Sequence, residues 1–161
     1  MGLLATLLSL LGCDPQRIAE LEEGVSTEAD VRARFGEPGQ IWDGPAGERI
    51  LEYTRQPAGH ENYMISIAPD GRMTALRQVL NPAMFARVQP GMSMEDVRRM
   101  LGQPMKVTPY PLKGETHYDW RYRDGPNVSD SKLFTVVFGS TDLRVKGSSS
   151  QPDPDLRPGG N

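Results

Sequence analysis

The feature that most constrains the fold of this chain is an internal repeat. Residues 91–104 have a close counterpart upstream at residues 24–38, and the similarity continues toward the N-terminus. Asp14-Pro15 corresponds to Asn81-Pro82 at a separation of 67 positions. Each of these pairs is an Asx cap followed by proline at the first helical position. The repeat therefore indicates two copies of one folding unit, each beginning with two short helices.

The repeated segment carries the signals that begin and end a short helix. Ser93 precedes Asp96 by three residues, so its hydroxyl can accept from a first-turn N–H while the carboxylate reaches back to the cap. The residues that share the apolar face are Val97, Met100 and Leu101, and Gly102 and Pro104 end the helix. The upstream copy repeats these signals with Thr27, Asp30, Val31, Phe35, Gly36 and Pro38.

Alternation of apolar and polar residues predicts four strands after each helix pair. We expect them at residues 40–43, 49–54, 63–68 and 72–80, and at 105–108, 116–123, 132–138 and 143–145. The predicted fold class is α+β, with two tandem ααββββ repeats, each a helix pair packed on one face of an antiparallel sheet. The inward residues should include Tyr53, Ile65, Ile67, Trp120, Phe134, Val136 and Phe138. The opposite face of each sheet should stay open.

These patterns also divide the chain. We expect the first repeat at residues 13–80 and the second at 81–146. Residues 147–161 contain too little apolar surface to offset the entropy of ordering, so they are predicted to form a disordered tail. Residues 1–12 are predicted to be a signal peptide, because the apolar run at residues 3–11 is too short to span a bilayer as a helix.

Leu10-Leu11-Gly12-Cys13 resembles a bacterial lipobox. The resemblance implies cleavage before Cys13 and acylation of its sulfur and new amino group, including by palmitate, so that a lipid anchors the chain to a membrane. The alternative is an ordinary apolar N-terminus with a buried cysteine. A myristoylation pattern beginning at Gly2 explains neither the leucine run nor Cys13.

The composition argues against several classes of function. A formal net charge of -3 gives no basic surface of the kind that nucleic acids need. One cysteine excludes an intramolecular disulfide and a cysteine-based metal cluster. We find no nucleophile motif, phosphate-binding glycine loop or metal-ligand pattern, so we expect no catalytic residue, metal, cofactor or small-molecule substrate.

One enzymatic alternative remains. His117 and Asp119 share a face of their strand, where they could form a general acid–base pair. A solvent-facing pair of polar residues is the simpler interpretation, because so short a motif carries little weight.

The open sheet faces are the expected protein-binding surfaces. The candidate residues are Glu52 and Met64 in the first repeat and His117, Asp119 and Arg121 in the second. Met92 and Met94 flank a helix cap, where flexible thioether side chains suit an adaptable contact. A plainly solvated sheet face is the alternative.

Residues 91–104 read Gly-Met-Ser-x-Glu-Asp-Val-x-x-x-Leu-Gly-x-Pro. This motif resembles the signature of the SmpA/OmlA (BamE) lipoproteins, and the tandem arrangement is similar to the β-lactamase inhibitor protein (BLIP) family. The first resemblance implies a non-catalytic, periplasm-facing lipoprotein that is anchored through Cys13 and binds an envelope protein of the β-barrel assembly machinery. It implies the outer membrane, although an aspartate at position 14 retains lipoproteins at the inner membrane in enteric bacteria. The second implies an inhibitor of a periplasmic or secreted enzyme.

Overall fold

The computed structural model describes residues 18–156. The predicted signal peptide, the predicted lipidation at Cys13 and the sorting residue Asp14 lie outside these residues, as does most of the first predicted helix. Within residues 18–156, no helix is long and apolar enough to cross a membrane.

The predicted fold class is confirmed, because two units with the same element order follow each other along the chain. The first contains α2 (Glu28–Phe35), β1 (Gln40–Asp43), η1 (Pro45–Gly47), β2 (Arg49–Thr54), β3 (Asn62–Ile67) and β4 (Met73–Gln78). The second contains α3 (Pro82–Phe85), α4 (Met94–Leu101), β5 (Lys106–Tyr110), η2 (Pro111–Lys113), β6 (Glu115–Arg123), η3 (Val128–Asp130), β7 (Ser131–Gly139), β8 (Val145–Pro152) and η4 (Pro154–Leu156). Each unit forms one antiparallel four-stranded sheet, in the orders β1-β2-β3-β4 and β5-β6-β7-β8.

The two longer helices begin and end as the repeat predicts. The Thr27 and Ser93 hydroxyls accept from the third helical N–H, which belongs to Asp30 in α2 and to Asp96 in α4. Both helices end at a glycine with positive φ, so the same local signals place equivalent helices in both units.

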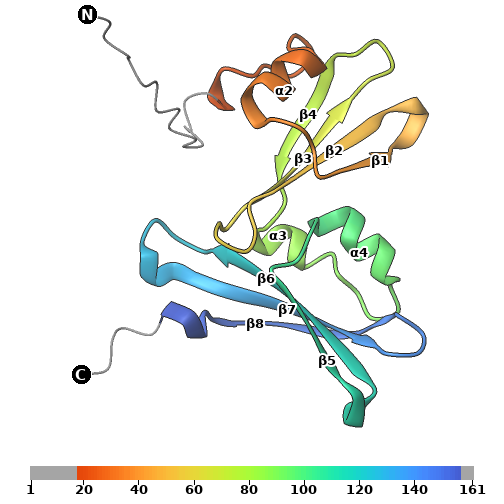
Figure 1. The fold of residues 1–161 in the computed structure, drawn as a ribbon, viewed down its shortest axis with the longest axis vertical. Coiled ribbons are helices and arrows are strands. Elements are labelled where there is room, and N and C mark those ends of the chain that lie inside the picture. Colours follow the sequence, from red (N-terminus) through yellow and green to blue (C-terminus); the bar gives the residue numbers. More distant parts are fainter. Residues whose placement is uncertain (1–17, 157–161) are drawn as a thin grey trace, which may run out of the picture.

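The elements stack in four layers, which Figure 1 shows from top to bottom as α2, the first sheet, α3 with α4, and the second sheet. One apolar core lies between α2 and the first sheet, where Val31 and Phe35 pack against strand residues of β2 and β3. The other lies between α3, α4 and the second sheet. The seven predicted inward residues are all buried.

The prediction of two open faces is wrong for the first sheet. Met64 and Val79 of the first unit belong to the second core cluster, together with residues of α3 and α4. The helix pair of the second unit therefore packs against both sheets (Figure 1). The prediction failed because the apolar pattern of each repeat gives no sign of a partner from the other repeat.

The prediction of a disordered tail is wrong for residues 147–156. Residues 147–152 continue β8, which pairs with β7 from Lys132↔Pro152 to Phe138↔Val145. A strand of Gly and Ser can form because the ladder joins backbone groups and needs no apolar side chain. The buried Asp153 carboxylate then fixes the end of the strand by accepting from Arg121 Nε and from the Ser131 hydroxyl.

Candidate interaction surfaces

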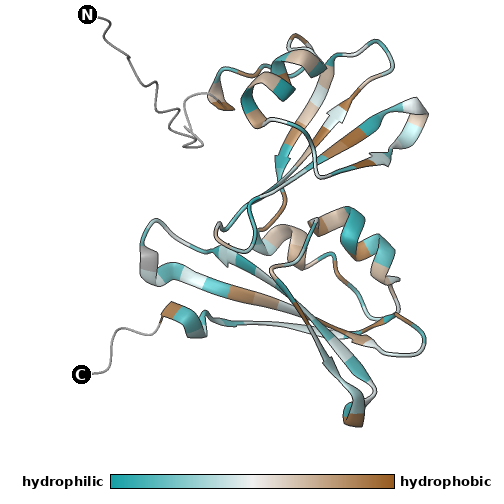
Figure 2. Ribbon diagram, viewed as in Figure 1, coloured by the Kyte–Doolittle hydropathy of each residue, from teal (hydrophilic) through white to brown (hydrophobic). Residues whose placement is uncertain are grey.

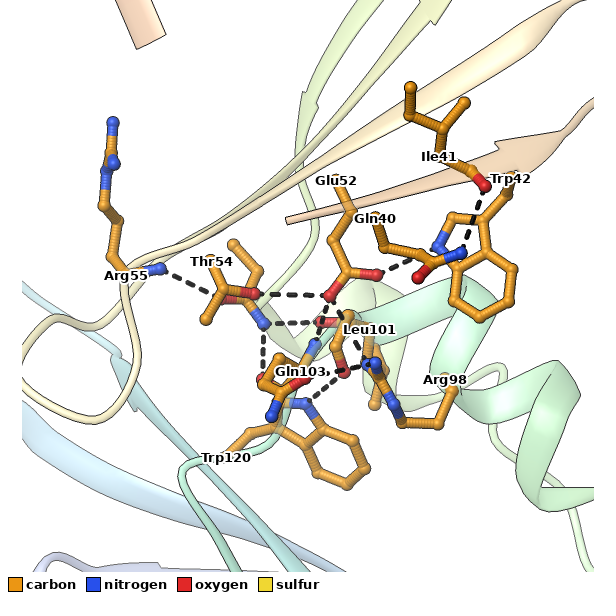
Figure 3. A network of polar contacts seen from close by, with 12 residues as sticks. Gln40, Ile41, Trp42, Glu52, Thr54, Arg55, Arg98, Leu101, Gln103 and Trp120 are labelled. Carbon is orange, nitrogen blue, oxygen red and sulfur yellow. Dashed lines mark hydrogen bonds and ion pairs between the residues drawn. The ribbon is translucent and has the colours of Figure 1, made fainter. Parts of the chain in front are cut away.

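The outer face of the first sheet is closed by the end of α4. Glu52 of β2 is 2% exposed, and its carboxylate accepts from the Gln103 backbone N–H at 2.7 Å and from Trp42 Nε1 at 2.9 Å (Figure 3). Arg98 of α4 forms an ion pair with the same carboxylate at 3.5 Å. The predicted exposure of Glu52 is therefore wrong, since this side chain joins the two units.

The carbonyls at the end of α4 are satisfied by residues of both sheets. Asn62 of β3 is fully buried and donates to the carbonyls of Leu101 and Gln103, at 2.8 and 2.9 Å. Trp120 of β6 donates from Nε1 to the Gly102 carbonyl at 3.0 Å (Figure 3). The last carbonyls of a helix have no partner within it, so this end of α4 is suited to bind two neighbours at once.

Glycine is required at position 102. Its φ is +76°, a backbone conformation that favours glycine. A Cβ there would lie 3.0 Å from Asn62 Nδ2 and 3.3 Å from Glu52 Oε1. The residue that ends the helix thus also permits the close contact with the first sheet.

A second contact joins the units at the β2–β3 loop. Gln56 exchanges two hydrogen bonds with the backbone of Arg121, donating to its carbonyl at 2.8 Å and accepting from its N–H at 3.1 Å. The Arg121 guanidinium donates to the Pro57 carbonyl and forms ion pairs with Asp153 and Asp155. The predicted partner-binding residue Arg121 is therefore occupied within the molecule.

His60, Ser131 and Asp153 form a chain that is not a nucleophilic triad. His60 Nε2 lies 2.9 Å from the Ser131 hydroxyl, and this hydroxyl donates to Asp153 at 2.9 Å. His60 must therefore donate to the serine and cannot accept its proton. Burial, with added repulsion from Arg123 and Arg121, lowers the pKa of His60, which favours the neutral ring.

His117 and Asp119 lie on the outer face of the second sheet, as predicted, but each has another partner. His117 Nε2 lies 3.2 Å from the Glu115 carboxylate, and its ring packs against Tyr110 at a centroid distance of 4.4 Å. Asp119 accepts from the Thr135 hydroxyl at 2.5 Å. These partners give no support to an acid–base pair between His117 and Asp119. The interactions with His117 and then Lys146 lower the pKa of Glu115, so a negative charge stays beside the imidazole.

The candidate methionines pack inward rather than outward. Met94 Sδ accepts from the Tyr118 hydroxyl at 2.7 Å, and Met92 Sδ accepts from the Gln89 N–H at 3.2 Å. Both are partly buried against the second core. Met64 is buried in the same cluster, although it also lines a groove between the units.

Within residues 18–156, no α-helix covers the outer face of the second sheet (Figure 1). The register places these side chains on it: Lys106, Thr108, Tyr110, Glu115, His117, Asp119, Arg121, Leu133, Thr135 and Val137. Beside it, Leu112 is fully exposed at the tip of the β5–β6 hairpin, which is brown in Figure 2. Sequence reasoning missed Tyr110 and Leu112, and the Pro-Tyr-Pro-Leu run in a predicted loop was the available signal.

Among the described residues, no group of three or more His, Cys, Asp or Glu side chains is arranged to hold a metal ion. The contacts above join the two units or stabilise one sheet. Within residues 18–156, the outer face of the second sheet takes no part in joining the units apart from Arg121 and Ser131 at its edge.

Comparison with known proteins finds a family similarity in this second unit. The model of the outer membrane protein assembly factor BamE domain matches residues 78–147. Among solved structures, a DUF4309 family protein (YjgB) from Bacillus subtilis is similar at 24% identity over 86% of each chain, with a TM-score of 0.34. An extracellular protein containing an SCP domain from Bacillus anthracis is similar at 13% identity over 86% of this chain and 46% of that one, with a TM-score of 0.32. No curated protein matches the chain. Residues 78–147, from the end of β4 to the start of β8, are thus similar to the BamE domain, and we refer to them below as the BamE-like domain.

Proposed function

We propose that this protein is a non-catalytic, protein-binding module of the bacterial cell envelope, anchored by a lipid at Cys13 and facing the periplasm. The observation that carries the proposal is the match of the BamE domain model to residues 78–147. The partner would be an envelope protein of the β-barrel assembly machinery, and the membrane would be the outer one. Residues 1–12 would be removed, and residues 13–80 and 81–156 would form the two units.

The binding surface in this proposal is the outer face of the second sheet. It belongs to the BamE-like domain, and no α-helix of the described residues covers it. His117, Thr108 and Val137 are partly exposed there, and they combine aromatic, hydroxyl and apolar groups within one surface. Mixed polarity of this kind is common at non-obligate interfaces.

The inhibitor alternative has no support from the geometry. An inhibitor of the BLIP type would use two joined, open sheet faces, but Glu52 and Asn62 bind the first sheet to the second unit.

Site-specific photocrosslinking in the native host tests the proposal. A photoreactive amino acid at position 108 or 117 should crosslink to a component of the barrel assembly machinery, identified by mass spectrometry. The matched control is position 33, which is exposed on α2 of the first unit. Crosslinks that form at position 33 but at neither of the other two would reject this surface.

The anchor needs a separate experiment. Mass spectrometry of the protein from native membranes should find acyl groups on Cys13, and Cys13→Ser should release the chain into the soluble fraction. An unmodified Cys13 in the native protein would reject the lipoprotein part of the proposal.

A further inference from the structure

A groove of about 490 Å³ lies between the outer face of the first sheet and the helices of the second unit. Its apolar lining comes from both units and includes Ile50, Met64, Val79, Met84 and Met100. The end of α4 packs tightly on the sheet at Glu52 and Asn62. The groove is the part of the same interface that residues 18–156 leave unfilled.

The lining can adapt to what it binds. Met64 comes from β3, Met84 from α3 and Met100 from α4, so three elements each contribute one flexible thioether side chain. Methionine fills irregular space well and is common at surfaces that accept varied apolar partners. The groove can therefore accommodate apolar side chains of different shapes.

The charged residues of the lining are all arginines: Arg77, Arg87 and Arg99. Arg77 forms an ion pair with Glu23, and Arg99 forms one with Glu95 while its guanidinium lies 4.9 Å from the Trp42 ring centre.

Arg87 is different, because the one contact recorded for its guanidinium among the described residues is with Met84 Sδ at 3.6 Å. Of the residues that the structure describes, none that lines the groove carries a carboxylate. A carboxylate on a bound molecule can therefore pair with Arg87 while the rest of that molecule contacts the apolar lining of the groove.

The polar lining distinguishes between two kinds of occupant. Ser66, Gln78 and Asn81 lie among the apolar residues of the groove. The Gln78 and Asn81 amides already bind backbone groups of the chain, but each keeps a second N–H and a second lone pair. A hydrocarbon chain would cover these remaining groups and the Ser66 hydroxyl without offering them hydrogen bonds, which costs free energy. The amide groups of a peptide can bind them.

We propose that this groove binds a peptide segment of a partner protein that carries a carboxylate next to apolar side chains. The carboxylate pairs with Arg87, and the apolar side chains enter between Met64, Met84 and Met100. This site lies between the units and is separate from the outer face of the second sheet. The proposal for the groove and the proposal for the outer face of the second sheet can therefore succeed or fail independently.

Selection from a random linear peptide library on the full chain carrying Cys13→Ser tests the inference. Enriched peptides should contain Asp or Glu beside aliphatic or aromatic residues. By fluorescence polarisation, Arg87→Glu should weaken their binding about tenfold or more, whereas Lys113→Glu should change it by less than about twofold. Lys113 is the matched control, because it is exposed on the distant β5–β6 hairpin and undergoes the same change of charge.

A second variant tests whether filling the groove, without changing its charge, prevents peptide binding. Ala83 is exposed on α3 and lines the groove, so Ala83→Trp should fill it and abolish peptide binding while circular dichroism stays unchanged. The inference is wrong if no acidic, apolar peptide is enriched or if Arg87→Glu and Lys113→Glu bind equally. It is also wrong if the protein binds phosphatidylglycerol vesicles through Arg87 and no peptide. Loss of the crosslinks at positions 108 and 117 would leave this result unaffected.

Discussion

The outer faces of the two sheets are built alike and used differently. Glu52 and Asp119 are 67 positions apart, the separation of the repeat, and both project from the second strand of their sheet on the side away from its own helix layer. Glu52 binds the end of α4, whereas Asp119 accepts from Thr135 within its own sheet. One helix pair thus covers the sheet before it and the sheet after it. Among residues 18–156, no α-helix covers the outer face of the second sheet.

Gly102→Val should have the largest effect on the joint between the units. A β-branched residue at φ +76° is strained, and its Cβ would crowd Asn62 and Glu52. We expect a loss of about 3–5 kcal/mol in the free energy of unfolding, measured by urea denaturation.

Gly36→Val is the matched control for that substitution. Gly36 has φ +81° at the end of α2, but a Cβ there would meet nothing within 4 Å. It should lose about 1–3 kcal/mol from backbone strain alone. Equal losses in the two variants would show that close packing at Gly102 contributes nothing.

Glu52→Ala should have the next largest effect. It leaves the Gln103 N–H, Trp42 Nε1 and the partly buried Arg98 without their acceptor. The expected loss in unfolding free energy is about 2–4 kcal/mol. Asp119→Ala, at the equivalent position, should lose less than about 1 kcal/mol. A larger loss of unfolding free energy for Asp119→Ala than for Glu52→Ala would contradict the conclusion that the outer face of the first sheet carries the more important structural contacts.

Asp153→Asn tests the end of the second sheet and its response to pH. Burial raises the pKa of Asp153, but hydrogen bonds from the Asp155 N–H, Ser131 and Arg121 outweigh it and hold the pKa below the ordinary 3.8. The ionised form therefore stabilises the fold above pH 3.8, and this stabilisation is lost as the pH falls through the lowered pKa.

Thermal unfolding followed between pH 2 and 7 measures this prediction. The unaltered chain should lose stability below about pH 4 more steeply than Asp153→Asn, which should be less stable at pH 7 by about 1–3 kcal/mol. Asp155→Asn, whose side chain is mostly exposed, is the control and should follow the unaltered chain. Parallel curves for all three proteins would contradict the role given to Asp153.

His117→Ala should have the smallest effect on stability. The imidazole is partly exposed on the open face and contacts Glu115 and Tyr110. We expect a change of less than about 0.5 kcal/mol in the free energy of unfolding. The same variant should reduce crosslinking from position 108 to the partner. A large loss of stability would mean that this face has a structural role.

Local signals in the sequence predicted most of the fold. The caps at Thr27 and Ser93, the glycine stops and the alternating strands are each set by neighbouring residues, and all appear in the structure. The joint depends instead on contacts between residues far apart, such as Glu52 with Gln103. Glu52 occupies a polar position of an alternating strand, where a buried carboxylate and a solvated one look the same. Residues 147–152 of β8 escaped prediction because backbone pairing with β7, rather than any side-chain pattern, orders them.

Amide hydrogen exchange at Gln103, measured by NMR, tests the shared helix pair most directly. Gln103 lies beyond the end of α4, and its N–H donates to the Glu52 carboxylate of the first sheet at 2.7 Å. The account predicts slow exchange at this amide in the intact chain and exchange typical of an exposed loop in Glu52→Ala. Fast exchange of Gln103 in the intact chain would mean that the second unit does not cover the first sheet, which would contradict the account.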